Sequence, residues 1–403
     1  MNKIKVVDKM LLKMAVRNLC RHKKRTILTL TVMVFGIFLS IFMLGLLKGM
    51  EMDMVELYIN TDIGKYKVYG EKFYDDKEDN EQVEFLMDEE NINKNLEGEN
   101  YSSRLVFLGT LISTKAEFPV KMIGVNKEEE NNVFEREKRI LDGNFLNNEK
   151  EIVIGYKIAN MLDLKVGDTV TIMGKTVTKG INADDIKIGG IIETKNLLID
   201  SGTIFMNLKF AKEFLGTEKV NDVVIMSKLN SKKIEKLEKN ADVITWQEEM
   251  KDLIEMMQFK TRANLIICFV ILIMSGVGIA NAMLMSVYES KKEIGILMAS
   301  GMERKNILSL FLYEGTIMGV LGSGIGLILG SGVVIYVQKH GIPMPYDMDE
   351  VGIEMAFPEV MRAYFNIETT LLIFLFGVVI ALVATFYPAY KATKFNPIEA
   401  LRD

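Results

Sequence analysis

The chain has 403 residues, with 49 Lys and Arg against 54 Asp and Glu, and its formal net charge is −5. This balance argues against a general nucleic-acid binder. The two cysteines rule out a disulfide framework and a cysteine zinc cluster, and the two histidines argue against a histidine-based metal or catalytic site. No G-x-x-x-x-G-K-[ST] motif occurs. We therefore expect no catalytic residue, no metal and no cofactor bound by this chain.

Four long apolar blocks dominate the hydropathy pattern. They cover residues 26–47, 261–288, 307–338 and 369–390, and Glu314 is the single charge within the third block. A helix of about 22 residues is about 33 Å long, which is enough to cross the hydrocarbon core of a bilayer. Four such blocks in one chain predict a membrane protein with four transmembrane helices.

The distribution of basic residues predicts the orientation of these helices. Lysine and arginine gather in the leader 1–25, in the connection 289–306 and in the tail 391–403, whereas the short loop 339–368 is mostly acidic. Short loops rich in Lys and Arg stay on the cytoplasmic side. The pattern therefore predicts that both termini are cytoplasmic and that the loop 339–368 and the long segment 48–260 lie outside.

The long outside segment, 48–260, is polar and is predicted to be a small α+β domain with a stalk. Strands rich in β-branched residues are predicted at 151–154, 169–172, 186–192, 203–206 and 222–226, and helices at 156–162, 208–215 and 232–239. The acidic stretch 75–84 is predicted to be a solvated loop. A helix over 247–288 would be about 60 Å long and would form the stalk, with a kink near 260–262 as the alternative.

Three stretches in combination resemble a known family of permeases. They read LKMAVRNLCRHKKRTILTLTVMVFGIF in the leader, SVYESKKEIGILMASGMERKNILSLFLYEGTIMGVLGSGIGLILG between the second and third blocks, and YPAYKATKFNPIEALRD at the end. Together they resemble the FtsX-like/MacB-like permeases, the membrane subunits of mechanotransmission (type VII) ABC transporters. The stretch ILDGNF…EIVIGYKIANMLDLKVGDTVTI resembles the periplasmic core domain of that family.

The resemblance implies a fold and a plan. The fold is an α-helical membrane domain of four transmembrane helices plus an α+β extracytoplasmic domain, which is a MacB-like periplasmic core domain. The layout of one helix, a large external domain and three further helices is most similar to that of the lipoprotein-releasing permeases. The chain departs from MacB itself because it has no fused nucleotide-binding domain.

The connection 289–306 alternates charged and apolar residues, as a short amphipathic helix does, and such a helix can dock in a groove on a partner. In the family this element is the coupling helix that docks on the ATPase, and the alternative is a helix lying on the lipid surface. The residues that we assign to ATPase coupling are Glu289, Lys292, Glu293, Ile294, Ile296, Leu297 and Gly301. Gly301 is expected to end the helix.

The leader is amphipathic, and its apolar residues are predicted to lie on an anionic leaflet as an elbow helix. These residues are Met10, Leu11, Met14, Ala15 and Leu19. In the third block, small residues at a spacing of four predict close helix packing in lipid. They are Gly315 and Gly319, then Gly322, Gly326 and Gly330. Glu314 is interpreted either as a structural polar anchor or as part of a proton or ion relay.

Methionines gather at the outer half of the first span and at the stalk. Met is flexible and adapts to varied apolar partners, so this face is a candidate contact for acyl chains, with lipid contact or helix packing as the alternative. The candidate residues are Met43, Leu46, Leu47, Met50 and Met54 on the first helix, and Met256 and Met257 on the stalk.

The function expected from the resemblance is that of a permease subunit that extracts lipoproteins from the bacterial inner membrane. The alternatives are export of peptides or small molecules with an adaptor and an outer-membrane duct, and regulation of external cell-wall hydrolases. The expected partners are separate ABC ATPase subunits that bind ATP and Mg, a second permease that is identical or related, the membrane, and a periplasmic carrier or adaptor, with no nucleic acid. A secondary carrier is disfavoured, because no inverted repeat is evident.

Overall fold

The computed structural model describes residues 2–70, 86–89, 92, 94, 96, 98–229, 234, 237, 241–343 and 360–396. These residues divide into two compact units. We call the first the membrane unit; it holds the described residues up to Met52, those from Met257 to 343, and those from 360 to 396. We call the second the α/β unit, and it holds those from Asp53 to Met256.

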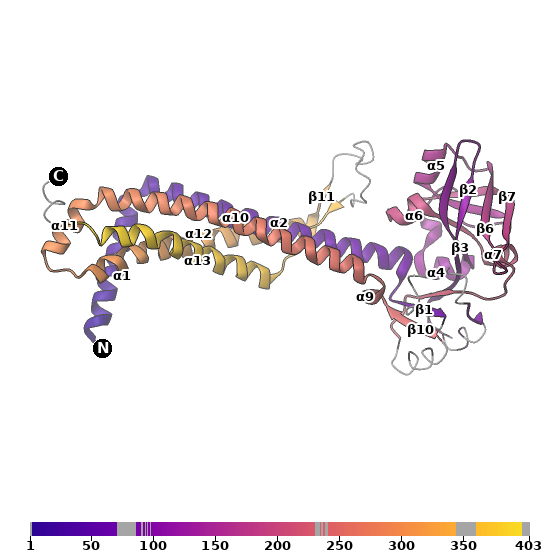
Figure 1. The fold of residues 1–403 in the computed structure, drawn as a ribbon, viewed down its shortest axis with the longest axis horizontal. Helices are drawn as coiled ribbons and strands as arrows, with labels where there is room; N and C mark the ends of the chain where they lie inside the picture. The colour runs from indigo at the N-terminus through magenta and orange to yellow at the C-terminus, as the bar shows by residue number, and fades with distance from the viewer. Residues whose placement is uncertain are drawn as a thin grey trace. The chain divides into compact units, whose positions relative to one another are not determined.

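Six helices belong wholly or mostly to the membrane unit (Figure 1). They are α1 (Asn2–Arg21), α2 (Lys23–Tyr58), α10 (Lys251–Glu289), α11 (Lys291–Ala299), α12 (Arg304–His340) and α13 (Ile367–Ala392). Two short strands of the same unit, β11 (Ile342–Pro343) and β12 (Val360–Met361), pair with each other. Four of the helices, α2, α10, α12 and α13, are long and apolar enough to cross a membrane. The four predicted membrane helices are thereby confirmed.

The helices α2 and α10 are longer than a bilayer requires. The α2 helix continues to Tyr58 and passes into a π-helical turn, η1 (Ile59–Ile63). The α10 helix runs unbroken over 39 residues, or about 58 Å, so the chain near 260–262 is helical and is not a linker. The prediction that the helix begins at residue 247 is wrong, because Met250 separates α10 from a four-residue helix, α9 (Trp246–Glu249).

Apolar clusters hold the membrane helices together. One cluster contains Met33 of α2, Ile279 of α10, Phe311 of α12 and Ala389 of α13. A second contains Ile37 of α2, Leu272 of α10, Val334 of α12 and Ile373 of α13. In the leader helix α1, Leu11 and Ala15 are buried against Leu310 of α12, and the predicted position of this helix on an anionic leaflet stays a prediction. Met10 is half exposed. The leader is therefore packed into the unit along one side.

The α/β unit is built on one mixed sheet. Its strands are β1 (Tyr66–Gly70), β2 (Tyr101–Ile112), β3 (Glu117–Val125), β4 (Ile140–Gly143), β5 (Glu151–Gly155), β6 (Thr169–Lys175), β7 (Ile181–Ile192), β8 (Thr203–Asn207), β9 (Asp222–Ile225) and β10 (Ala241–Thr245). The order is β10-β1-β9-β2-β3-β8-β5-β7-β4, and β6 pairs with β2 and β7. The pairs β3–β8 and β5–β7 are parallel, and the other pairs are antiparallel.

Short helices connect these strands and cover the core. They are α4 (Lys127–Phe134), η3 (Arg136–Arg139), α5 (Tyr156–Leu162), α6 (Leu197–Gly202) and α7 (Leu208–Leu215). The predicted strands and the helices at 156–162 and 208–215 are confirmed, whereas the predicted helix 232–239 and loop 75–84 lie outside the described residues, apart from 234 and 237. The sequence did not predict β1 to β4, β10, α4 or α6.

Candidate functional site

The α11 helix lies between two membrane spans and ends in a defined turn. Gly301 has a positive φ of 92°, and its N–H donates to the carbonyl of Met298 at 3.0 Å. The N–H of Met302 donates to the carbonyl of Leu297, also at 3.0 Å. These two bonds form a Schellman motif, which satisfies carbonyls at the helix end and requires a residue that tolerates the left-handed conformation. Gly301 therefore ends α11 by its backbone geometry.

Two arginines of the leader bind residues on either side of the turn between α10 and α11. Arg25 donates to Glu289 at 2.6 Å and to Ser286 at 2.9 Å, and Arg21 forms an ion pair with Glu293. Glu289 and Glu293, which the sequence assigned to ATPase coupling, are thus engaged within the chain. The sequence offered only one signal for this, a basic leader and two glutamates at the start of the connection 289–306. The exposed pair Arg21–Glu293 joins α1 to α11, and the pair Arg25–Glu289 joins α2 to the end of α10.

The apolar residues of α11 divide between the protein interior and the surface. Ile294 is buried in the cluster with Ile307 and Phe311, so it belongs to the core and is not part of a docking face. Ile296 is 55% exposed, and Leu297 is half-buried. Lys292 is exposed. The exposed surface of α11 therefore includes Ile296 and Lys292, with Leu297 partly exposed beside them, and docking of an ATPase there stays a prediction.

Glu314 is buried in α12 with an exposed fraction of 1%. Its carboxyl accepts a hydrogen bond of 2.7 Å from the side chain of Asn18 in α1. A cavity of about 10 Å³ beside it is lined by Asn18, Arg25 and Thr29 among others, which is at the lower limit for one water molecule. The leader thus supplies the polar partner that an intramembrane carboxyl needs.

The glycines of α12 lie where neighbouring helices approach most closely. A Cβ atom at Gly315 or Gly319 would meet Thr385 or Ala381 of α13 at 2.1 or 2.8 Å. On the α2 side, a Cβ atom at Gly322, Gly326 or Gly330 would meet Met33, Ile37 or Ile41 at 2.9, 2.7 or 3.1 Å. Contacts this short leave no room for a larger side chain. The spaced glycines therefore lie against two different helices.

A cavity of about 330 Å³ lies among α2, α10, α12 and the segment leading into α13. Most of its lining is aliphatic or aromatic, and Leu44, Leu47, Leu265, Val334 and Phe365 contribute to it. Lys48 and Glu368 add charge to the same cavity. This size is at the lower end of the range of about 300–1,000 Å³ for small-ligand sites. The lining also includes the polar side chains of Thr261, Asn366, Thr369 and Thr370, and this mixture of apolar and polar groups suits an amphiphile.

The structure separates the candidate cargo contacts into different environments. Leu47 lines the cavity, whereas Met43 and Leu46 pack on the apolar cluster of the bundle. Met50 and Met54 are half-buried on α2, Met257 is buried and Met256 is 46% exposed on α10. Leu47 is therefore the one of these residues that the structure brings to the cavity lining.

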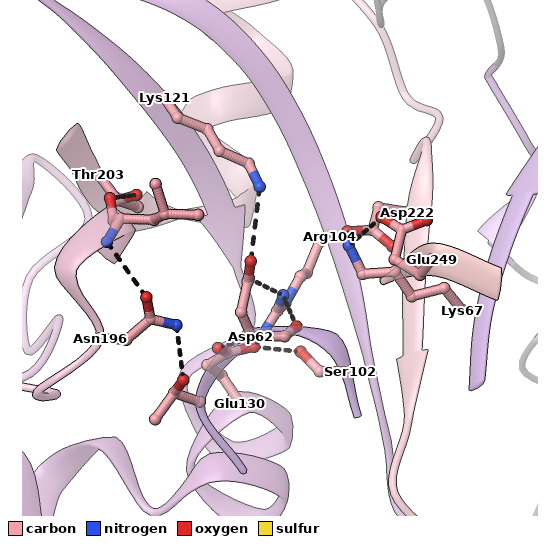
Figure 2. A network of polar contacts seen from close by, with 12 residues as sticks. Asp62, Lys67, Ser102, Arg104, Lys121, Glu130, Asn196, Thr203, Asp222 and Glu249 are labelled. Carbon is pink, nitrogen blue, oxygen red and sulfur yellow. Dashed lines mark hydrogen bonds and ion pairs between the residues drawn. The ribbon is translucent and has the colours of Figure 1, made fainter. Parts of the chain in front are cut away.

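A network of buried charges in the α/β unit was missed by the sequence analysis (Figure 2). Glu130 of α4 is fully buried between two fully buried arginines, Arg104 of β2 and Arg136 of η3. Arg104 donates to its carboxylate at 2.8 and 3.0 Å, and Arg136 donates at 2.9 and 3.0 Å. Burial raises the pKa of Glu130, but the two guanidinium charges outweigh it and hold that pKa below its usual range. Glu130 therefore stays ionised.

A second group of buried charges lies along β1. Lys67 lies 3.4 Å from a carboxylate oxygen of Asp222 and 3.6 Å from one of Glu249, and all three side chains are largely buried. The hydroxyl of Tyr69 donates to Glu249 at 2.9 Å. Burial lowers the pKa of Lys67, but Asp222 and the other neighbouring acidic groups outweigh it and raise that pKa well above its usual value. The ammonium group therefore remains charged.

Two family matches cover most of the chain. Residues 26–244 match the MacB-like periplasmic core domain, and residues 265–397 match the FtsX-like permease C-terminal domain. An uncharacterized ABC transporter permease of Methanocaldococcus jannaschii is 25% identical over 64% of this chain and 63% of its own length. The alignment thus spans just under two thirds of that relative.

Two further relatives carry functional names. The lipoprotein-releasing system transmembrane protein LolC of Neisseria meningitidis serogroup B is 22% identical over 95% of this chain and 96% of its own length. The macrolide export ATP-binding/permease protein MacB of Haemophilus ducreyi is 23% identical over 96% of this chain. The alignment covers 55% of the length of that relative. The order of a periplasmic core domain and an FtsX-like domain, together with the four apolar helices, identifies the architecture. The chain belongs to the FtsX-like and MacB-like family of ABC transporter permeases.

Proposed function

We propose that this permease extracts lipoproteins from the bacterial inner membrane, driven by separate ATPase subunits. The cavity lined by Leu47 is the observation that carries the proposal. A lipoprotein anchor has acyl chains beside a polar end, and the cavity combines apolar walls with Lys48 and Glu368. The similarity to a relative named LolC over nearly the whole of both chains supports the same class of cargo.

The energetics of such a site are modest. Burying an acyl chain from water gains about 0.8 kcal/mol per CH₂. Cargo that already lies in a bilayer gains little of this, because lipid is as apolar as the cavity. The site therefore needs only to match the lipid environment, and ATP-driven narrowing of the cavity is enough to expel the chain.

The proposed cycle begins at the cytoplasmic side. Two ATPase subunits bind ATP and Mg, and their closure displaces α11 through the exposed Ile296. The ion pairs from Arg21 and Arg25 carry this displacement to the leader. A second permease, identical or related, completes the transporter, and a periplasmic carrier accepts the cargo. This chain itself makes and breaks no covalent bond.

The orientation proposed for this cycle has both termini in the cytoplasm. It is supported by the basic segments that flank the spans. Single cysteines at Lys195 and at Asp349, which lies outside the described residues, should react with an impermeant reagent in intact spheroplasts. Cysteines at Lys292 and Lys394 should react only after lysis. The background lacks Cys20 and Cys268, and labelling at position 292 in intact spheroplasts would reverse the orientation.

The alternative function is export of peptides or small molecules with an adaptor and a duct, which the similarity to MacB over 96% of this chain favours. A reconstitution separates the two functions. The permease is co-purified with its ATPase, placed in proteoliposomes and supplied with a triacylated lipopeptide and an acceptor protein. Extraction predicts ATP-dependent transfer of the lipopeptide, but not of the same peptide without acyl chains. Transport of the unlipidated peptide, or of a macrolide, without lipopeptide transfer would favour export.

A further inference from the structure

The end of the α2–η1 helix is bound by two buried arginines. Helix ends leave carbonyl groups without a helical partner, and these carry the negative end of the helix dipole. Arg136 donates to the carbonyl of Thr61 at 2.6 Å, and Arg104 donates to the carbonyl of Asp62 at 2.9 Å. The side chain of Arg104 also lies 3.3 Å from the carboxylate of Asp62. Two cations thus cap the last turn of this helix from within the α/β unit.

The positions of both arginines are themselves fixed. Glu130 accepts hydrogen bonds from both guanidinium groups, and Ser102 donates to the same carboxylate at 2.8 Å. The guanidinium of Arg136 also lies between the rings of Phe134 and Phe205, at 4.8 and 4.7 Å from their centroids. A planar guanidinium that is held by a carboxylate and stacked on two rings has little freedom to move. The cap therefore holds the helix end in one place and one direction.

The chain segment that precedes α10 is held by the same part of the sheet. Glu249 is in α9, two residues before α10 begins, and it binds Tyr69 and Lys67 of β1. Strand β1 follows directly after η1, and it pairs with β9, which carries Asp222. Lys67 joins Asp222 to Glu249. The segment that enters the α/β unit is thus bound by β2 and η3, and the segment that leaves it is bound by β1, with β9 between β1 and β2 in the sheet (Figure 2).

Stability alone does not account for buried ions at this place. Replacing a buried ion cluster by apolar side chains of similar size is often neutral or stabilising. What an ion cluster adds is direction, because each hydrogen bond fixes an angle as well as a distance. A helix end held by apolar contact alone can slide or rotate, whereas the end at Thr61 and Asp62 is held by directed bonds.

We infer that Arg104, Glu130 and Arg136 are positioning residues that form a rigid joint, through which movement of α2 displaces the sheet instead of being absorbed by bending at residues 59–65. This inference rests on the mechanical cycle proposed above. Lys67 and Glu249 do the same for the segment entering α10. The joint converts work done at the ATPase into displacement of the α/β unit.

The test uses the full-length permease in complex with its ATPase. The joint variant carries Arg104→Met, Glu130→Leu and Arg136→Met, which keep the core filled but remove both caps. Spin labels at Glu56 and Glu218, both exposed, report the distance between the end of α2 and the sheet. The background lacks Cys20 and Cys268. The control variant carries Lys115→Gln and Asp163→Asn, which remove an exposed ion pair.

The wild type and the control should give a narrow distance distribution, and the joint variant a broad one. The joint variant should hydrolyse ATP as before but release less lipopeptide per ATP, because bending at residues 59–65 then absorbs part of the movement of α2. A narrow distribution with unchanged release would overturn the inference. If the joint variant does not accumulate, Arg136→Lys tests the same claim, since one ammonium cannot replace the guanidinium fork, and an unchanged distribution there would equally overturn it.

The two proposals fail in different ways. If the wild type transfers no lipopeptide while the joint variant still broadens the distances, the cargo assignment is wrong and the joint stands. If the wild type transfers lipopeptide and the joint variant does so equally well at the same distances, the joint is wrong and the cargo assignment stands.

Discussion

Asn18 in the leader donates a hydrogen bond of 2.7 Å to Glu314, which lies 296 residues later in α12. The bond joins the amphipathic leader to the one carboxyl within an apolar span. It is reinforced by the packing of Leu11 and Ala15 against Leu310. We interpret Glu314 as a polar anchor that fixes the leader, rather than as a member of an ion relay.

The first prediction separates these two roles. Asn18→Leu leaves the buried carboxyl without its donor and should lower the free energy of unfolding by about 1–3 kcal/mol. Glu314→Gln keeps an acceptor for Asn18, so ATP-driven transport should persist. Thermal unfolding in detergent and transport in proteoliposomes measure the two effects, with Thr31→Val as an exposed control. Loss of transport in Glu314→Gln at normal stability would favour the relay.

The second prediction concerns two glycines of the same helix. A Cβ atom at Gly326 would lie 2.7 Å from Ile37 and 2.9 Å from a backbone oxygen of α2, so Gly326→Ala should destabilise the bundle by about 1–3 kcal/mol. Gly324 has nothing within 4 Å, and Gly324→Ala should be neutral or stabilise by up to about 1 kcal/mol. Melting in detergent compares the pair. Equal effects of the two substitutions would contradict the packing role of Gly326.

The third prediction concerns docking of the ATPase. Ile296→Asp with Leu297→Asp should release the ATPase, because Ile296 is exposed on α11 and Leu297 is partly exposed beside it. The ratio of ATPase to permease after affinity purification in mild detergent measures the effect. Ile296→Leu should keep the ATPase bound. Full retention of the ATPase by the double aspartate variant would show that α11 is not the docking element.

The fourth prediction is a pH effect in the α/β unit. Burial raises the pKa of Asp200 to about 6, although its carboxylate accepts hydrogen bonds from Thr194. Between about pH 4 and 6, Asp200 is therefore protonated in the folded state and ionised in the unfolded state. This stabilising contribution is complete below pH 4 and is lost as the pH rises through 6, a change of up to about 3 kcal/mol.

Asp200→Asn provides the comparison for this effect, because its amide oxygen still accepts from Thr194. Melting of the full-length protein between pH 4 and 7 should show a fall in stability for the wild type that the variant lacks. If both proteins respond to pH in the same way, Asp200 does not titrate in this range.

The spans were predictable because their signal is local. An apolar stretch of about 20 residues without charge can cross a bilayer whatever the rest of the fold is. The helix α5 and its flanking strands likewise carry helical and β-branched patterns in their own sequence. Strand β2 was missed because Ser102, Ser103 and Arg104 are polar yet fully buried. Because polar residues fill these buried positions, the alternation of apolar and polar residues that indicates a half-buried strand is absent. Their hydrogen-bond partners lie far along the chain, so the sequence does not reveal them.

The joint could not have been predicted for a related reason. Glu128, Glu129 and Glu130 form an acidic run that is typical of a solvated helix face, and only contact with Arg104 and Arg136 singles out Glu130. The leader was predicted to be an elbow helix on an anionic leaflet, and that remains a prediction. The ion pairs of its arginines with Glu289 and Glu293 were not predicted, because the partners lie 264 and 272 residues further along the chain.

The most direct test of the proposed cargo site is a photo-crosslinking residue at Leu47, with a second at Met50. The complex is mixed with triacylated lipopeptide in nanodiscs, and crosslinked products are identified by mass spectrometry before and after addition of ATP. We predict crosslinks from position 47 to the lipopeptide that disappear with ATP. Crosslinks only to phospholipid or to a neighbouring helix, unchanged by ATP, would contradict the account.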